Sequence, residues 1–72
     1  MTESEIIAEL GVLAEKIAPH SEHSRSIQTL YDAGEWGVLL EFIENEANNP
    51  VFDQQDRLEI ARIRSEIGPT GE

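Results

Sequence analysis

Hydrophobic residues recur along this chain at the three-to-four-residue spacing of an α-helix, in four separate stretches. The helices that this spacing predicts span about residues 3–18, 21–33, 35–47 and 54–67. Strictly alternating apolar and polar positions, the mark of a half-buried strand, are not found. The apolar stripes are Ile6, Leu10, Leu13 and Ile17, then His23, Ile27, Leu30 and Tyr31, then Trp36, Leu39, Leu40, Ile43 and Ala47, and last Ile60, Ile63 and Ile67.

Residues that begin or end helices bound these stretches. Thr2 and Glu5 have the spacing of a capping box at the start of the first helix. Gly34 provides a left-handed stop after the second helix. Asp53 is the predicted N-cap of the fourth helix, and Phe52 before it is the apolar half of a hydrophobic staple. Helix ends are also indicated by Pro19, Pro50 and the Gly68-Pro69 pair.

These elements predict an all-α fold, a compact bundle of three to four short helices joined by short connections. Residues 1–68 form a single helical domain in this prediction, and residues 69–72 form a flexible C-terminal tail. Two apolar residues, Val12 and Leu58, lie away from the stripes of their helices. We expect them to contact a neighbouring helix, and the alternative is that they are exposed anchors for a partner.

The chain has 72 residues and no cysteine, which limits the classes of protein to which it can belong. A chain of this length forms one domain, with no room for a deep substrate cleft beside its core. Without cysteine it forms neither disulfides nor thiolate metal sites, which favours a reducing, cytoplasmic location. Residues 1–5 carry acidic side chains where a signal peptide would carry basic ones, so we predict no signal peptide. The apolar runs are too short for a membrane span.

Candidate catalytic and metal-binding residues are few. His20 and His23 are the only histidines, and with Glu22 between them a zinc site is conceivable. Such a pair at a helix start, with no third ligand nearby, is more typical of solvated or packing side chains. No serine or carboxylate pair has the partners of a catalytic site, and no phosphate-binding glycine loop is present. We therefore predict no catalytic residue, no metal, no cofactor and no enzymatic activity.

The charge is the strongest indication of function. With 15 acidic and 5 basic residues the formal net charge is −10, which argues against nucleic acid and membranes as partners. Between Ser26 and Asp56 there is no lysine or arginine. A solvated helix face is one explanation, but so complete an absence of bases favours a surface that binds a basic protein. The acidic residues of this segment are Asp32, Glu35, Glu41, Glu44, Glu46, Asp53 and Asp56.

The segment YDAGEWGVLLEFI at residues 31–43 resembles a stretch of the small helical immunity proteins of bacterial polymorphic toxin and contact-dependent growth inhibition systems. The Maf-type immunity family is the most similar. In that stretch a helix end is followed by Gly-Glu-aromatic-Gly, an apolar run, Glu and further apolar residues. Gly34 permits the turn, Glu35 complements the positive end of the next helix, and Gly37 permits close approach of helices.

The resemblance implies a cytoplasmic immunity protein that binds the toxic domain of a cognate secreted effector and neutralises it. Because such toxins often have basic substrate clefts, an acidic helical face would cover the cleft. On this interpretation Asp32, Glu35, Glu41 and Glu44 supply the negative contacts, and Trp36 holds the two helices in register.

Two other interpretations share these residues. The main alternative is a helical adaptor or regulatory subunit that links proteins without inhibiting an enzyme. The other is an acidic mimic of DNA, which would require carboxylates spaced like phosphates along a groove, whereas the acids here are clustered. The sequence pattern indicates no particular oligomeric state.

Overall fold

Four α-helices and one short 3-10 helix make up the computed structural model, which describes residues 2–68. The all-α prediction is confirmed, since the described residues contain no strand. The predicted tail at residues 69–72 lies outside the described residues. In chain order the elements are α1 (Glu3–Ile17), η1 (Ala18–His20), α2 (Ser24–Ala33), α3 (Trp36–Asn45) and α4 (Gln54–Ile67).

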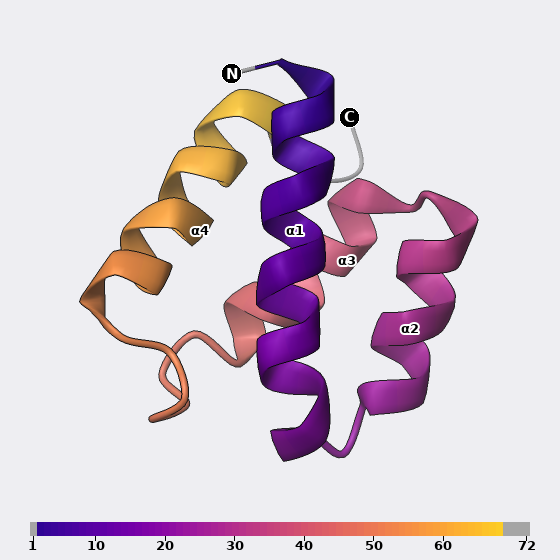
Figure 1. The fold of residues 1–72 in the computed structure, drawn as a ribbon, viewed down its shortest axis with the longest axis vertical. Helices are drawn as coiled ribbons and strands as arrows, with labels where there is room; N and C mark the ends of the chain where they lie inside the picture. Colours follow the sequence, from indigo (N-terminus) through magenta and orange to yellow (C-terminus); the bar gives the residue numbers. More distant parts are fainter. Residues whose placement is uncertain (1, 69–72) are drawn as a thin grey trace.

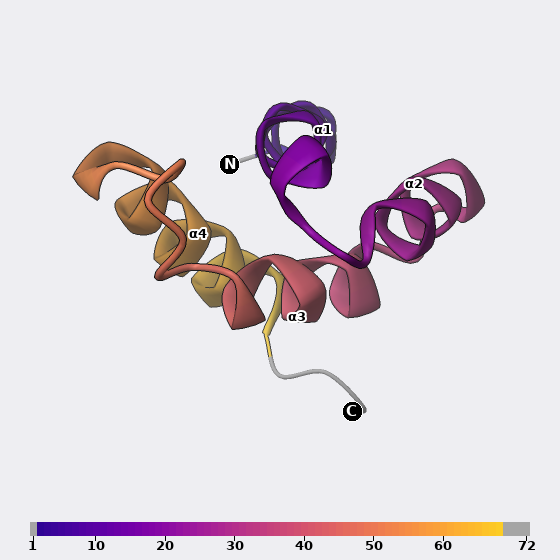
Figure 2. The ribbon, with the colours of Figure 1, turned by 90° about the horizontal axis from the view of Figure 1, so that it is seen from below.

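The first helix lies against the other three. In Figure 1, α1 stands in front of α3, with α4 on one side and α2 on the other. The view from below shows the same arrangement, with α2, α3 and α4 forming a layer under α1 (Figure 2). Within the described residues α2 and α4 do not contact each other, and α3 crosses between them. The start of α1, the α2–α3 turn and the end of α4 therefore lie at the same end of the molecule (Figure 1).

The core is built mainly from the predicted stripes, which apart from His23 turn toward the space between α1 and the layer. Ile17, Leu39 and Ile63, for example, come from three different helices and are fully buried. Within the described chain no polar or charged residue is buried with them. The buried residues are Leu10, Leu13, Ala14, Ile17, Ile27, Leu39, Leu40, Ile43, Phe52, Ile60 and Ile63.

The predicted caps are present. The Thr2 hydroxyl accepts a hydrogen bond from the Glu5 backbone N–H at 3.2 Å, and the Glu5 carboxylate accepts one from the Thr2 N–H at 3.0 Å. Asp53 caps α4 in the same way, with Asp56 as its reciprocal partner. Gly34 adopts the left-handed conformation, with φ of 75°. These bonds satisfy amides that have no partner inside the helix.

The second helix begins later than predicted, at Ser24. Pro19 lies within the 3-10 helix Ala18–His20, and Ser21 then takes an extended conformation. The Ser21 hydroxyl accepts a hydrogen bond from the His23 N–H at 3.0 Å, a local turn that competes with helix. His23 is therefore outside α2 and exposed, so its assignment to the buried stripe was wrong; its ring meets Phe42 edge-on at 5.7 Å.

The segment between α3 and α4 also differs from the prediction. The third helix ends at Asn45 and not at Ala47, because consecutive turns occupy the residues before Pro50. Phe52 is 1% exposed and lies in the core. A hydrophobic staple would require an apolar residue one turn later, but that position is Arg57, whose guanidinium donates to the Phe52 carbonyl at 2.7 Å.

Val12 and Leu58 are 60% and 57% exposed. The expectation that they contact a neighbouring helix is therefore wrong. Each lies on the side of its helix that faces solvent, where an apolar side chain contributes little to the stability of the monomer.

Candidate functional site

The turn between α2 and α3 positions the first of the predicted binding residues. The Gly34 N–H donates to the Tyr31 carbonyl at 3.1 Å, and the Glu35 N–H donates to the Leu30 carbonyl at 3.0 Å. This double closure is a Schellman motif, which only a residue with positive φ allows without strain. It places Glu35 at the N-cap position of α3, exposed and without a side-chain capping bond. The carboxylate therefore faces solvent at the positive end of the helix.

Trp36 is the first residue of α3 and is half-buried. Its ring meets the ring of Tyr31 at 5.4 Å between centroids and at 68°, an edge-to-face contact. Since Tyr31 belongs to α2, this aromatic pair joins the two helices directly behind the acidic turn.

Glu35 and Trp36 also line a hollow of about 510 Å³ at this end of the molecule. The first turn of α1 and the last turn of α4 complete its walls, so the hollow combines segments from both ends of the described chain. No lysine or arginine is among the described residues that line it. Its lining residues are Glu3, Ile6, Gly34, Glu35, Trp36, Gly37, Glu66 and Ile67.

The sequence interpretation did not identify Glu3 or Ile6 as neighbours of Trp36. Ile6 was assigned to the core stripe and Glu3 only to the start of a helix. The signal available was the chain order: with short connections, consecutive helices reverse direction, so the start of the first helix returns beside the start of the third.

Asp32 lies in the last turn of α2 and is exposed. The side-chain amide of Gln28, one turn earlier, donates to its carboxylate at 3.0 Å. A neutral amide orients the carboxylate without removing its charge, so Asp32 adds to the negative charge beside Glu35.

Glu44 is not part of an uncompensated surface, and this prediction was wrong. Arg64 of α4 binds its carboxylate with two nitrogens, Nε at 3.0 Å from Oε2 and Nη2 against Oε1. The same guanidinium donates to the Gly68 carbonyl at 2.7 Å. The hydrogen bonds to Glu44 raise the pKa of Arg64, and the charges of Glu44 and Glu41 raise it further. Glu44 therefore joins α3 to α4, and Glu41 lies exposed within the field of the same arginine.

Two of the remaining bases also pair with acids of α4. Lys16 of α1 pairs with Asp56 of α4, and Arg62 lies 3.8 Å from Glu59 within α4. In the described chain, Asp32, Glu35 and Glu41 form no ion pair. The structure thus brings together Asp32, Glu35 and Trp36 at the turn, with Glu41 farther along α3 and Glu44 neutralised.

The histidines do not assemble a metal site. His23 Nε2 lies 3.6 Å from a carboxylate oxygen of Glu22, and His20 is exposed at the end of η1. Across residues 2–68 no three metal-ligating side chains are grouped closely enough to hold an ion. No helix in that range combines the length and the apolar composition needed to cross a membrane.

Comparison with known proteins gives no matching family model, no matching curated protein and no matching solved structure. The exposed carboxylates of Asp32 and Glu35, beside the half-buried indole of Trp36, are suited to binding cationic side chains, because both carboxylates and aromatic faces attract cations.

Proposed function

We propose that this domain is an immunity protein, which binds the basic toxic domain of a cognate secreted effector in the cytoplasm and neutralises it. The observation that supports the proposal best is the turn that carries Asp32, Glu35 and Trp36, where the two exposed carboxylates form no ion pair among residues 2–68 and the indole packs against Tyr31. The resemblance of residues 31–43 to Maf-type immunity proteins supports the same interpretation, because it covers this turn.

The proposed mechanism is occlusion led by charge. A net charge of −10 draws a cationic surface toward the domain over distances of about 10 Å. Glu35, Asp32 and Glu41 then pair with lysine and arginine side chains around the cleft of the toxin. Because the Schellman turn and the Tyr31–Trp36 contact fix the backbone, little conformational entropy is lost when the turn is bound.

The test is co-expression with the toxic domain encoded beside this protein, together with affinity measurements on the purified pair. The test variant combines Asp32→Asn, Glu35→Gln and Glu41→Gln. We expect growth protection to be lost and the Kd to rise by about tenfold or more at low salt. The matched control, Glu9→Gln with Glu22→Gln and Glu59→Gln, removes the same charge elsewhere and should change the Kd by less than about threefold.

Two outcomes would contradict the proposal. A Kd that stays constant as salt increases from about 50 to 500 mM would exclude an association led by charge. A stable complex in which the toxin keeps its full activity would instead favour the helical adaptor.

A further inference from the structure

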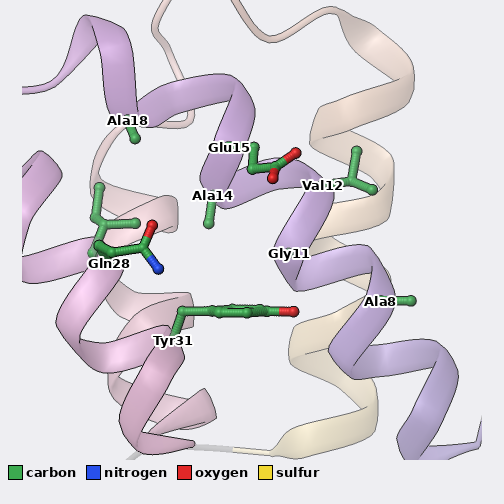
Figure 3. A pocket seen from close by; sticks show the side chains of 9 residues that line it. Ala8, Gly11, Val12, Ala14, Glu15, Ala18, Gln28 and Tyr31 are labelled. Atoms are coloured by element: carbon green, nitrogen blue, oxygen red, sulfur yellow. The ribbon is translucent and has the colours of Figure 1, made fainter.

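A groove of about 250 Å³ runs between α1 and α2, on the opposite side of α1 from α4. The α1 wall includes the small residues Ala8, Gly11 and Ala14, and the ring of Tyr31 lies across the groove toward Gly11 (Figure 3). A Cβ atom at Gly11 would lie 2.9 Å from the Tyr31 hydroxyl, so only glycine lets the ring lie this close. A cavity of about 150 Å³ holds a benzene ring, so this groove has room for an aromatic or branched side chain.

The rim of the groove carries an apolar side chain that the fold does not use. Val12 lines the groove and is 60% exposed. In Figure 3 it stands on α1 beyond Gly11 and Glu15. An apolar residue in this position loses water contact only when a second molecule covers the groove.

The charge around the groove indicates which partner fits. Glu15 lines it and is exposed, and Gln28 lines it while binding the carboxylate of Asp32. No described lining residue is lysine or arginine. Lys16, the next residue after Glu15, points to the other side of α1 and pairs with Asp56. By contrast, the hollow on the outer side of α2 and α3 contains Arg25.

One residue links the groove to the acidic turn. Tyr31 lines the groove, and its ring is in edge-to-face contact with the ring of Trp36 at the turn. The groove is therefore joined to the turn through this aromatic pair.

We propose that the groove docks an amphipathic basic helix of the partner, with one large apolar side chain inserted between α1 and α2 beside Val12. Lysine or arginine residues flanking that side chain pair with Glu15 and Asp32. This inference rests on the proposed function for the charge of the partner, and it adds an apolar anchor that charge alone does not supply.

Two synthetic peptides test the groove. Both are amidated helices of alanine and lysine with the same charge, and one has a central tryptophan where the other has alanine. Titrated into the ¹⁵N-labelled protein, the tryptophan peptide should bind about tenfold more tightly. Its resonance shifts should centre on Gly11, Val12 and Gln28. Val12→Ser should reduce this advantage to about threefold or less, whereas Leu58→Ser, an equally exposed control on α4, should leave it unchanged.

The proposed docking groove would be refuted by equal Kd values for the two peptides, or by equal effects of the two serine variants on the Kd of the tryptophan peptide. Shifts confined to Asp32, Glu35 and Glu41 would also overturn it, while leaving the proposed acidic surface intact. Shifts in the groove combined with a Kd insensitive to salt would support the apolar anchor and count against the charge-led function.

Discussion

Gly11→Ala provides the sharpest test of the packing between α1 and α2. In an unhindered helix interior, alanine is more favourable than glycine by about 1 kcal/mol. Here the new methyl group would lie 2.9 Å from the hydroxyl oxygen of Tyr31, 3.1 Å from Cε2 and 3.2 Å from Cζ. The ring must shift, and its edge-to-face contact with Trp36 limits where it can go. Overpacking of this kind costs about 1–3 kcal/mol, so we expect a net loss of about 1 kcal/mol.

The sign should reverse when the ring is removed. Tyr31→Leu eliminates the three atoms that approach Gly11 while it retains an apolar side chain. In that background Gly11→Ala should stabilise the protein by about 1 kcal/mol, which gives a coupling of about 2 kcal/mol between the two positions. Tyr31→Phe removes only the hydroxyl, so in that background the effect of Gly11→Ala on stability should lie between its effects in the wild-type and Tyr31→Leu backgrounds.

Urea denaturation followed by circular dichroism at 222 nm measures the free energy of unfolding of the wild type and of each variant. At an m-value of about 1 kcal/mol/M, each expected difference shifts the midpoint by about 1 M. The reasoning is refuted if Gly11→Ala stabilises the protein equally in the wild-type and Tyr31→Leu backgrounds, since the ring would then exert no constraint on α1.

Two further predictions concern the ion pairs that join α4 to the other helices. Arg64→Lys cannot keep both bonds to Glu44, and because these side chains are 24% and 33% exposed, we expect a loss of about 1 kcal/mol, or about 5 °C in Tm by calorimetry. Glu44→Gln should cost a similar amount, and an unchanged Tm in both variants would show that the pair does not hold α3 to α4. Lys16 lowers the pKa of Asp56 below its ordinary 3.8 through a hydrogen bond, and the same bond raises the pKa of Lys16 above 10.5. The pair therefore stabilises the fold at pH values between the two pKa values. Its contribution is lost as the pH falls through the lowered pKa of Asp56 or rises through the raised pKa of Lys16. We expect the Tm difference between wild type and Asp56→Asn to be largest near pH 7 and to shrink at acidic and at alkaline pH.

Helix identity and caps could be predicted because they depend on residues close in sequence. The Thr2–Glu5 box and the Asp53 cap each involve positions three residues apart, and the apolar stripes repeat within one helix. The start of α2 could not be predicted in the same way. Glu22 and His23 fit a helical pattern, but a hydrogen bond from the His23 N–H to the Ser21 hydroxyl favours a turn.

The candidate site shows the same division. The turn itself was predictable, since Gly34 selects the left-handed conformation and fixes Glu35 and Trp36 relative to α2. Its surroundings depend on tertiary contacts between segments distant in sequence. Ile6 and Ile67 line one hollow with Trp36 only because α1 and α4 return to the same end of the bundle. The order of the helices and their short connections indicate that end, but the spacing of residues within a helix does not identify which side chains meet there.

Glu44 shows why a count of uncompensated acids overestimates a binding surface. Within residues 26–56 it has no basic neighbour in sequence, yet Arg64, twenty positions later, binds it with two nitrogens. Exposing a carboxylate held in this way is unfavourable, because separating the pair would break its two hydrogen bonds to a partly buried guanidinium. A binding surface on this fold is therefore built more readily from carboxylates that form no ion pair among the described residues, and Asp32 and Glu35 meet that condition. The Lys16–Asp56 pair joins α1 to α4 on the opposite side of α1, so we place the apolar anchor of the partner between α1 and α2.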